Sequence, residues 1–183
     1  VLPVVNAGNI TAYWRGYKEY AAARIAANLP KMLGFQAAGA APIVHGHPIA
    51  TPQTFATAIR IGNPASWKTA VQARDESGGL IDMVTDDEIR AAYKMVASVE
   101  GVFAEPASAA GIAGVVKLAK EGYFDRHTPR VGDRLRVVCI LTGHGLKDPD
   151  SAIKAAEEPI TIEAQEEDVL DAIGIVSAEP AVF

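Results

Sequence analysis

The chain has 183 residues, 49% of them hydrophobic and 21% charged, and a formal net charge of −5. This length suits one domain with a sizeable core, and the composition argues against a disordered chain. No basic cluster indicates a nucleic-acid partner, and no apolar run approaches the ~20 residues that a membrane span requires. The single cysteine, Cys139, excludes a disulfide within the chain and fits a reducing cytoplasm; in its apolar run it is expected to be a buried, unreactive side chain.

The first residues predict a buried strand followed by a loop and a helix. The apolar run 1–5 has no signal-peptide pattern, so we expect a core strand entered in mid-chain and a piece of a longer polypeptide. The loop Asn6-Ala7-Gly8-Asn9 follows, and an amphipathic stretch begins directly after it. Short side chains before a helix N-terminus leave backbone N–H groups free to bind phosphate. A simple turn with Asn9 as the helix cap explains the same pattern.

Further along the chain, strand-like and helix-like patterns alternate. Cap residues followed by Pro open two of the helices, at Thr51-Pro52 and Asn63-Pro64, and Thr85 with Glu88 forms a capping box. The expected strands are 1–5, 31–36, 80–84 and 136–141, and the expected helices are 10–25, 51–59, 65–77, 85–100, 107–121, 148–158 and 166–173. This alternation predicts an α/β fold with a mainly parallel sheet and helices on both faces.

A second glycine loop, Thr142-Gly143-His144-Gly145, follows the last predicted strand. Ligands of parallel sheets bind at the carboxyl ends of strands, where both loops are expected to lie, so the two loops suggest one cofactor held at two ends. Neither loop matches the dinucleotide fingerprint or a Walker motif, and no hydrolase motif is visible. His45 and His47 flank a turn without a third ligand nearby in sequence, so no metal site is predicted.

Taken together, the segments resemble the threonine synthase family. The resemblance runs in order from the first residue to about Asp150 and is looser in the acidic tail. Its most specific part is Ile61-Gly62-Asn63-Pro64-Ala65-Ser66-Trp67. The segments that carry it are 3–14, 57–67, 105–109 and 142–148.

The resemblance implies a pyridoxal 5'-phosphate enzyme of fold type II, the tryptophan-synthase-β type. Such an enzyme is a lyase that forms L-threonine and phosphate from O-phospho-L-homoserine and water, the last step of threonine biosynthesis. By this resemblance, residues 1–158 are the C-terminal part of the large cofactor-binding domain and 159–183 an acidic tail, in a cytoplasmic enzyme that is a homodimer at full length. The resemblance also implies that Thr142 bonds the pyridine nitrogen and that five loop residues hold the cofactor phosphate: Val5, Asn6, Ala7, Gly8 and Asn9.

The chain departs from the family pattern in two places. Val5 stands where the family's phosphate loop has its first Gly; a positive φ there would strain this β-branched residue by roughly 1–3 kcal/mol, and an extended backbone would tolerate it. The Ser-Phe-Lys motif that carries the Schiff-base lysine is not found, so this chain by itself is expected to hold no catalytic residue and to be inactive. Two other interpretations remain open: a related threonine or serine dehydratase, and a non-catalytic remnant acting as a binding module.

Overall fold

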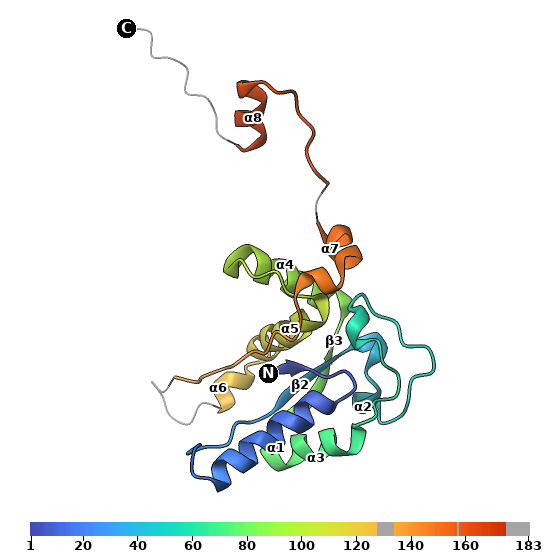
Figure 1. Cartoon of the computed structure of the whole chain (residues 1–183), viewed down its shortest axis with the longest axis vertical. Helices are drawn as coiled ribbons and strands as arrows, with labels where there is room; N and C mark the ends of the chain where they lie inside the picture. Colours follow the sequence, from blue (N-terminus) through green and yellow to red (C-terminus); the bar gives the residue numbers. More distant parts are fainter. Residues whose placement is uncertain (128–133, 157, 175–183) are drawn as a thin grey trace.

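The computed structural model describes residues 1–127, 134–156 and 158–174 (Figure 1). Its centre is a parallel sheet in the order β1 (Leu2–Pro3), β2 (Leu33–Ala37) and β3 (Leu80–Val84). In the register, Leu2 pairs with Gly34 and Leu33 pairs with Leu80. Every residue of β2 is buried, as expected for a central parallel strand covered on both sides. The predicted parallel sheet is confirmed.

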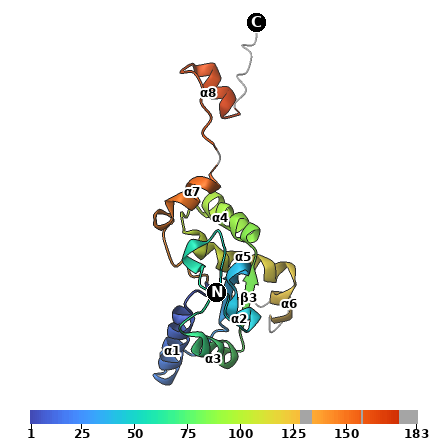
Figure 2. The same ribbon diagram turned by 90° about the vertical axis from the view of Figure 1, so that its right-hand side faces the viewer.

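Helices cover both faces of this sheet. One hydrophobic cluster joins the sheet to α1 and α3, and a second joins it to α4 and α5 (Figures 1 and 2). Side chains alternate between the two faces, so Phe35 packs in the α4–α5 cluster whereas Ile81 packs in the other. The main helices are α1 (Gly8–Ala22), α3 (Trp67–Ser77), α4 (Asp86–Glu100) and α5 (Pro106–Lys120).

Shorter helices complete the described chain. The helices α2 (Pro42–His45) and α6 (Tyr123–His127) fall where the sequence predicted no helix. The helix α7 (Pro149–Ala155) ends three residues before its predicted end. Single 3-10 turns occur at Ala38–Ala40, Thr57–Ile59 and Gly145–Lys147.

The clearest agreement between sequence and structure lies at the start of α4. The Thr85 hydroxyl accepts the Glu88 N–H (3.2 Å), and the Glu88 carboxylate accepts the Thr85 N–H (2.7 Å). This reciprocal capping box satisfies two N–H groups that the helix itself leaves unbonded. Gly101 then ends the helix with a left-handed φ of 66°.

The helix predicted over 51–59 is wrong. Apart from the 3-10 turn at its end, this segment is irregular because its backbone bonds to distant residues instead of to itself. The Gln53 N–H donates to the Gly39 carbonyl (3.0 Å), and the Phe55 N–H donates to the Asp86 carboxylate (2.8 Å). The helix predicted from residue 65 starts later, at Trp67, and the Ala65 and Ser66 N–H groups before it bond to Asn6.

The strand predicted over 136–141 is not assigned as a strand, yet part of it lies beside β1. The Val1 nitrogen donates to the Val138 carbonyl (2.7 Å), and the Ile140 N–H donates to the Val1 carbonyl (2.9 Å). In parallel strands one residue bonds to both neighbours of the residue opposite it, so this pattern pairs Val1 with Cys139. Val138 remains 60% exposed, and pairing does not extend further.

Cys139 is half-buried rather than fully buried, and burial raises the pKa of its thiol. A raised pKa lowers the thiolate fraction at neutral pH, which agrees with the predicted unreactive side chain.

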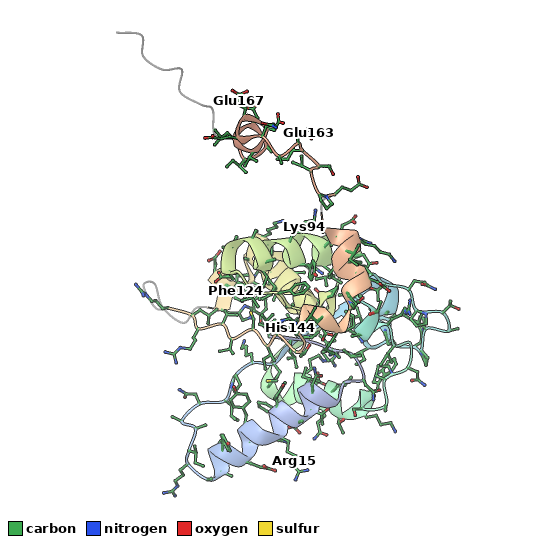
Figure 3. All side chains as sticks on the ribbon, turned by 45° about the horizontal axis from the view of Figure 1, so that its top comes forward. Arg15, Lys94, Phe124, His144, Glu163 and Glu167 are labelled. Atoms are coloured by element: carbon green, nitrogen blue, oxygen red, sulfur yellow. The ribbon has the colours of Figure 1, made fainter. Side chains whose placement is uncertain are left out.

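The last described helix, α8 (Glu166–Ala172), stands apart from the rest of the chain in both ribbon views (Figures 1 and 2). It buries none of its residues, and the labelled Glu167 on α8 and Glu163 just before it lie away from the main body (Figure 3). The acidic tail predicted over 159–183 stays a prediction, since residues 175–183 lie outside the described part of the chain. Among the described residues, no helix is long and apolar enough to cross a membrane.

Candidate cofactor site

The first predicted loop joins β1 to α1 and is shaped by an uncommon backbone conformation. Ala7, the N-cap of α1, is fully buried and adopts the left-handed conformation (φ 63°, ψ 6°) without a side-chain cap. For an alanine this conformation costs about 1–2 kcal/mol, and such strain is concentrated at functional sites. The following residues, Gly8 and Asn9, begin the helix, so their N–H groups have no acceptor within it.

Side-chain bonds hold this loop in place. The Asn9 amide Nδ2 donates to the Pro3 carbonyl (2.9 Å), and the Asn9 Oδ1 accepts the Ile10 N–H (2.9 Å). Asn9 therefore links the end of β1 to the first turn of α1 rather than serving as the N-cap. Val5 is half-buried against the α4–α5 cluster and lies outside the left-handed region, which excludes the strain considered for it.

The same loop is tied to the start of α3. The Asn6 Oδ1 accepts the Ala65 N–H (2.7 Å), and the Asn6 carbonyl accepts the Ser66 N–H (3.1 Å). At Gly8 an added Cβ would lie 3.9 Å from the Ser66 Oγ, and no closer atom outside its immediate neighbourhood is found. Exposed Gly8 thus leaves an open space lined by a serine hydroxyl and by free helix N–H groups. Ser66 belongs to the segment 61–67, the most specific part of the family resemblance, and the fold brings it to this loop.

The second loop is fixed by the start of α5. The Glu105 N–H donates to the Gly143 carbonyl (2.8 Å), and the Gly143 N–H donates to the Ser108 Oγ (3.0 Å). The exposed Thr142 places its hydroxyl 3.1 Å from that Ser108 Oγ and 3.4 Å from the Glu105 Oε1. No sequence pattern marks Ser108 or Glu105 individually as a site residue. What could have indicated them is their place in the segment 105–109, which carries the family resemblance.

Glu105 is a buried carboxylate within this cluster. Its side chain is 4% exposed and forms an ion pair with Lys147, whose side chain is 60% exposed (3.0 Å). His144 has a structural role: its Nδ1 accepts the Leu146 N–H (3.2 Å) and its ring contacts Phe103 edge-on (5.4 Å between centroids). In Figure 3, His144 is labelled in the middle of the main body. No group of three or more potential metal ligands is found in the part of the chain that the structure describes.

Both loops leave the sheet at the same edge. Because Val1 pairs with Cys139 in the parallel pattern, Val4 and Thr142 stand the same number of residues beyond the paired positions. Neighbouring strands lie about 4.8 Å apart, and parallel strands point the same way. The loops at Gly8 and Thr142 therefore follow neighbouring chain segments that run in the same direction, on the side of the sheet where parallel strands end and bind ligands.

The geometry fits a cofactor with a phosphate group and a heteroaromatic ring. The first loop offers free N–H donors, an open space at Gly8 and a neighbouring hydroxyl, which suit phosphate. The second loop offers the neutral hydroxyl of Thr142, which suits a ring nitrogen.

Comparison with known proteins agrees with this geometry. Curated relatives are threonine synthases from Mycobacterium leprae (52% identical; 96% of this chain, 47% of the relative), Mycobacterium tuberculosis H37Rv (57%; 84% and 41%) and Methanocaldococcus jannaschii (52%; 89% and 40%). The chain thus spans about half the length of the curated relatives it matches.

Solved structures show the same fold at low sequence identity. A threonine deaminase from Solanum lycopersicum has a TM-score of 0.62 at 22% identity, covering 84% of this chain and 42% of that one. An L-serine ammonia-lyase from Rhizomucor miehei has a TM-score of 0.59 at 16% identity, covering 85% and 49%. The family model described as "Pyridoxal-phosphate dependent enzyme" matches residues 1–143, from the first strand to the second glycine loop. The chain belongs to the family of pyridoxal-phosphate dependent enzymes.

Proposed function

We propose that this chain forms the C-terminal part of a threonine synthase, which converts O-phospho-L-homoserine and water to L-threonine and phosphate. The observation that carries the proposal is the identity of 52–57% to threonine synthases over 84–96% of the chain. The placement of both glycine loops at one sheet edge supports it. In this proposal residues 1–158 belong to the large domain and 159–183 form an acidic tail, and the complete enzyme is a cytoplasmic homodimer.

Val5, Asn6, Ala7, Gly8 and Asn9 are the proposed phosphate-binding residues. Bonds to charged groups contribute about 1.5–3 kcal/mol each, whereas a helix N-terminus adds about 0.3–1 kcal/mol. Several N–H donors therefore dominate the binding of a phosphate with nearly two negative charges. The Asn6 Oδ1 already accepts the Ala65 N–H, so its Nδ2 is the part of that side chain suited to a phosphate oxygen.

Thr142 is the proposed partner of the pyridine nitrogen. Pyridoxal phosphate, when bound, supplies an electron sink for bonds at the amino-acid α-carbon. A hydroxyl is neutral and can donate its proton to an unprotonated ring nitrogen, whereas a carboxylate would hold that nitrogen protonated. Thr142 therefore favours the unprotonated ring.

The Schiff-base lysine is proposed to come from outside these 183 residues. Lys117 donates to the Asp82 carboxylate (2.7 Å) and to the Met83 carbonyl (2.9 Å), which commits it to a structural pair. Lys18 pairs with Glu76, and Lys147 pairs with Glu105 at the second loop. The other lysines, Lys31, Lys68, Lys94, Lys120 and Lys154, are exposed.

The test measures phosphate release from O-phospho-L-homoserine by the complete enzyme with pyridoxal phosphate. We expect L-threonine and phosphate in equal amounts, and no turnover by the 183-residue chain alone. Formation of a 2-oxo acid from threonine or serine without phosphate release would instead establish a dehydratase. Absence of any cofactor binding by the complete protein would favour a non-catalytic binding module.

A further inference from the structure

A short chain of hydrogen bonds surrounds the Thr142 hydroxyl. It begins at the Gly143 N–H, which donates to the Ser108 Oγ (3.0 Å), and it continues from the Ser108 Oγ to the Thr142 Oγ1 (3.1 Å). It ends at the Glu105 Oε1, 3.4 Å from the Thr142 Oγ1. Ser108 is fully buried and Glu105 is 3% exposed, so water has little access to two of its members.

The direction of the bonds follows from counting protons. Ser108 has one hydroxyl proton and already accepts the Gly143 N–H. Two acceptors lie within reach of that proton: the Thr142 Oγ1 at 3.1 Å and the Gly143 carbonyl at 3.5 Å. Either hydroxyl can donate across the 3.1 Å contact, but Ser108 donates to Thr142 whenever the Thr142 proton goes to an acceptor that has no proton of its own, such as the Glu105 carboxylate or an unprotonated ring nitrogen. Thr142 then has its own proton left to donate.

Glu105 is a weak hydrogen-bond acceptor for that remaining proton. A distance of 3.4 Å exceeds the usual 2.5–3.0 Å for bonds between oxygens, so the bond from Thr142 is weak. Lys147 lies 3.0 Å from the other carboxylate oxygen and draws its negative charge away from Thr142. A closer acceptor on the exposed side of Thr142 therefore replaces Glu105 as the acceptor of the Thr142 proton.

We propose that Ser108 is a positioning residue that commits Thr142 to donate its hydroxyl proton to the ring nitrogen of the cofactor, and that Glu105 is the acceptor that competes with the ring for this proton. This inference rests on the proposed function, because it assumes that Thr142 faces the ring. The buried Ser108 hydroxyl donates its proton to a lone pair of the Thr142 oxygen from the side of the protein interior. Glu105 is the weak acceptor that holds the proton until the ring nitrogen replaces it.

Two substitutions are expected to change cofactor affinity in opposite directions. Ser108→Ala removes the donor behind Thr142, which frees the hydroxyl to rotate, and should raise the cofactor dissociation constant about fivefold. Glu105→Gln removes the competing carboxylate. The glutamine amide can donate to the Thr142 oxygen, so the threonine proton turns to the ring and affinity should rise about threefold.

The experiment uses the complete holoenzyme, with dissociation constants from cofactor titration and the ¹⁵N chemical shift of ring-labelled cofactor. Ser151→Ala is the matched control, because Ser151 is also a buried serine but lies in α7. Ser108→Ala should move the ¹⁵N signal as the bond from Thr142 weakens, and Ser151→Ala should not. In a Thr142→Val background, Ser108→Ala and Glu105→Gln should both lose their effects on affinity.

Several results would overturn the inference. Equal effects of the substitutions with and without the Thr142 hydroxyl would show that Ser108 and Glu105 act on the loop rather than through Thr142. Weaker binding by Glu105→Gln, or an unchanged ¹⁵N signal in Ser108→Ala, would also contradict it. If wild-type enzyme binds no cofactor, the proposed function itself fails, which is a separate outcome. If Ser108→Ala does not fold, the direction of the change in cofactor affinity in Glu105→Gln still tests the inference.

Discussion

Gly143 lies where the second loop meets the start of α5, and replacing it with alanine should disrupt that junction. An added Cβ would overlap the Oε1 and Cδ atoms of Glu105 and lie 2.7 Å from Oε2. Glu105 is buried and holds Gly143 through its own N–H (2.8 Å), so the carboxylate has little room to retreat. Overpacking of this kind costs about 1–3 kcal/mol, and a disturbed buried hydrogen bond adds about 1 kcal/mol.

We therefore expect Gly143→Ala to destabilise the protein by about 3 kcal/mol. For a domain of this size, each kcal/mol corresponds to a shift in Tm of about 2–4 °C, so thermal unfolding should show a Tm lower by about 6–12 °C. Gly16→Ala is the matched control, because Gly16 lies inside α1 and its added Cβ would meet nothing within 4 Å. There, alanine should stabilise the helix by about 0.5–1 kcal/mol.

Two results would refute this reasoning about Gly143. One is a Tm for Gly143→Ala within error of wild type. The other comes from a Glu105→Ala background, in which the overlap no longer exists. If Gly143→Ala lowers the Tm there by as much as it does in wild type, the carboxylate is not the cause.

Three further predictions concern charge, cofactor and packing. Bonds from Lys18, Trp14 and Gln72 lower the pKa of Glu76 from its ordinary 4.5 to about 2, so it stabilises the fold above pH 4.5 and this contribution fades as the pH falls towards 2. Glu76→Gln should therefore reduce the fall in urea midpoint between pH 4.5 and 2, and an identical fall would contradict this. Thr142→Asp should protonate the ring nitrogen and change the cofactor's absorption spectrum and activity. An unchanged spectrum and activity would show that Thr142 is not the group that keeps the ring nitrogen unprotonated. Val5→Gly should destabilise the protein by about 2 kcal/mol in urea unfolding, because it removes a half-buried side chain and adds backbone freedom; a gain in stability would indicate hidden strain.

Local sequence signals predicted the elements whose hydrogen bonds are local. The capping box of Thr85 and Glu88, for example, satisfies its donors within four residues. The segment after Thr51 carries an equally good helix-start pattern, yet its N–H groups bond to Gly39 and Asp86. Such distant partners leave no mark in the local pattern, so tertiary bonds overrode it.

The candidate site was predictable to a similar extent. Both loops could be found because a glycine-rich turn after an apolar run is a local signal. The left-handed Ala7 was missed, because alanine gives no sign that it adopts a glycine-like conformation. The buried Glu105 was missed for another reason: its partners Lys147 and Gly143 are about 40 residues away in the chain.

The pairing of Val1 with the segment around Cys139 bears on how the molecule folds. Its hydrogen bonds join residues 137 positions apart, nearly the full length of the main body. Contacts this distant raise the contact order, which slows folding because so long a loop must close before they form. We therefore expect the loop proposed to face the ring to be placed late, so that uptake of the coenzyme follows completion of the fold rather than guiding it.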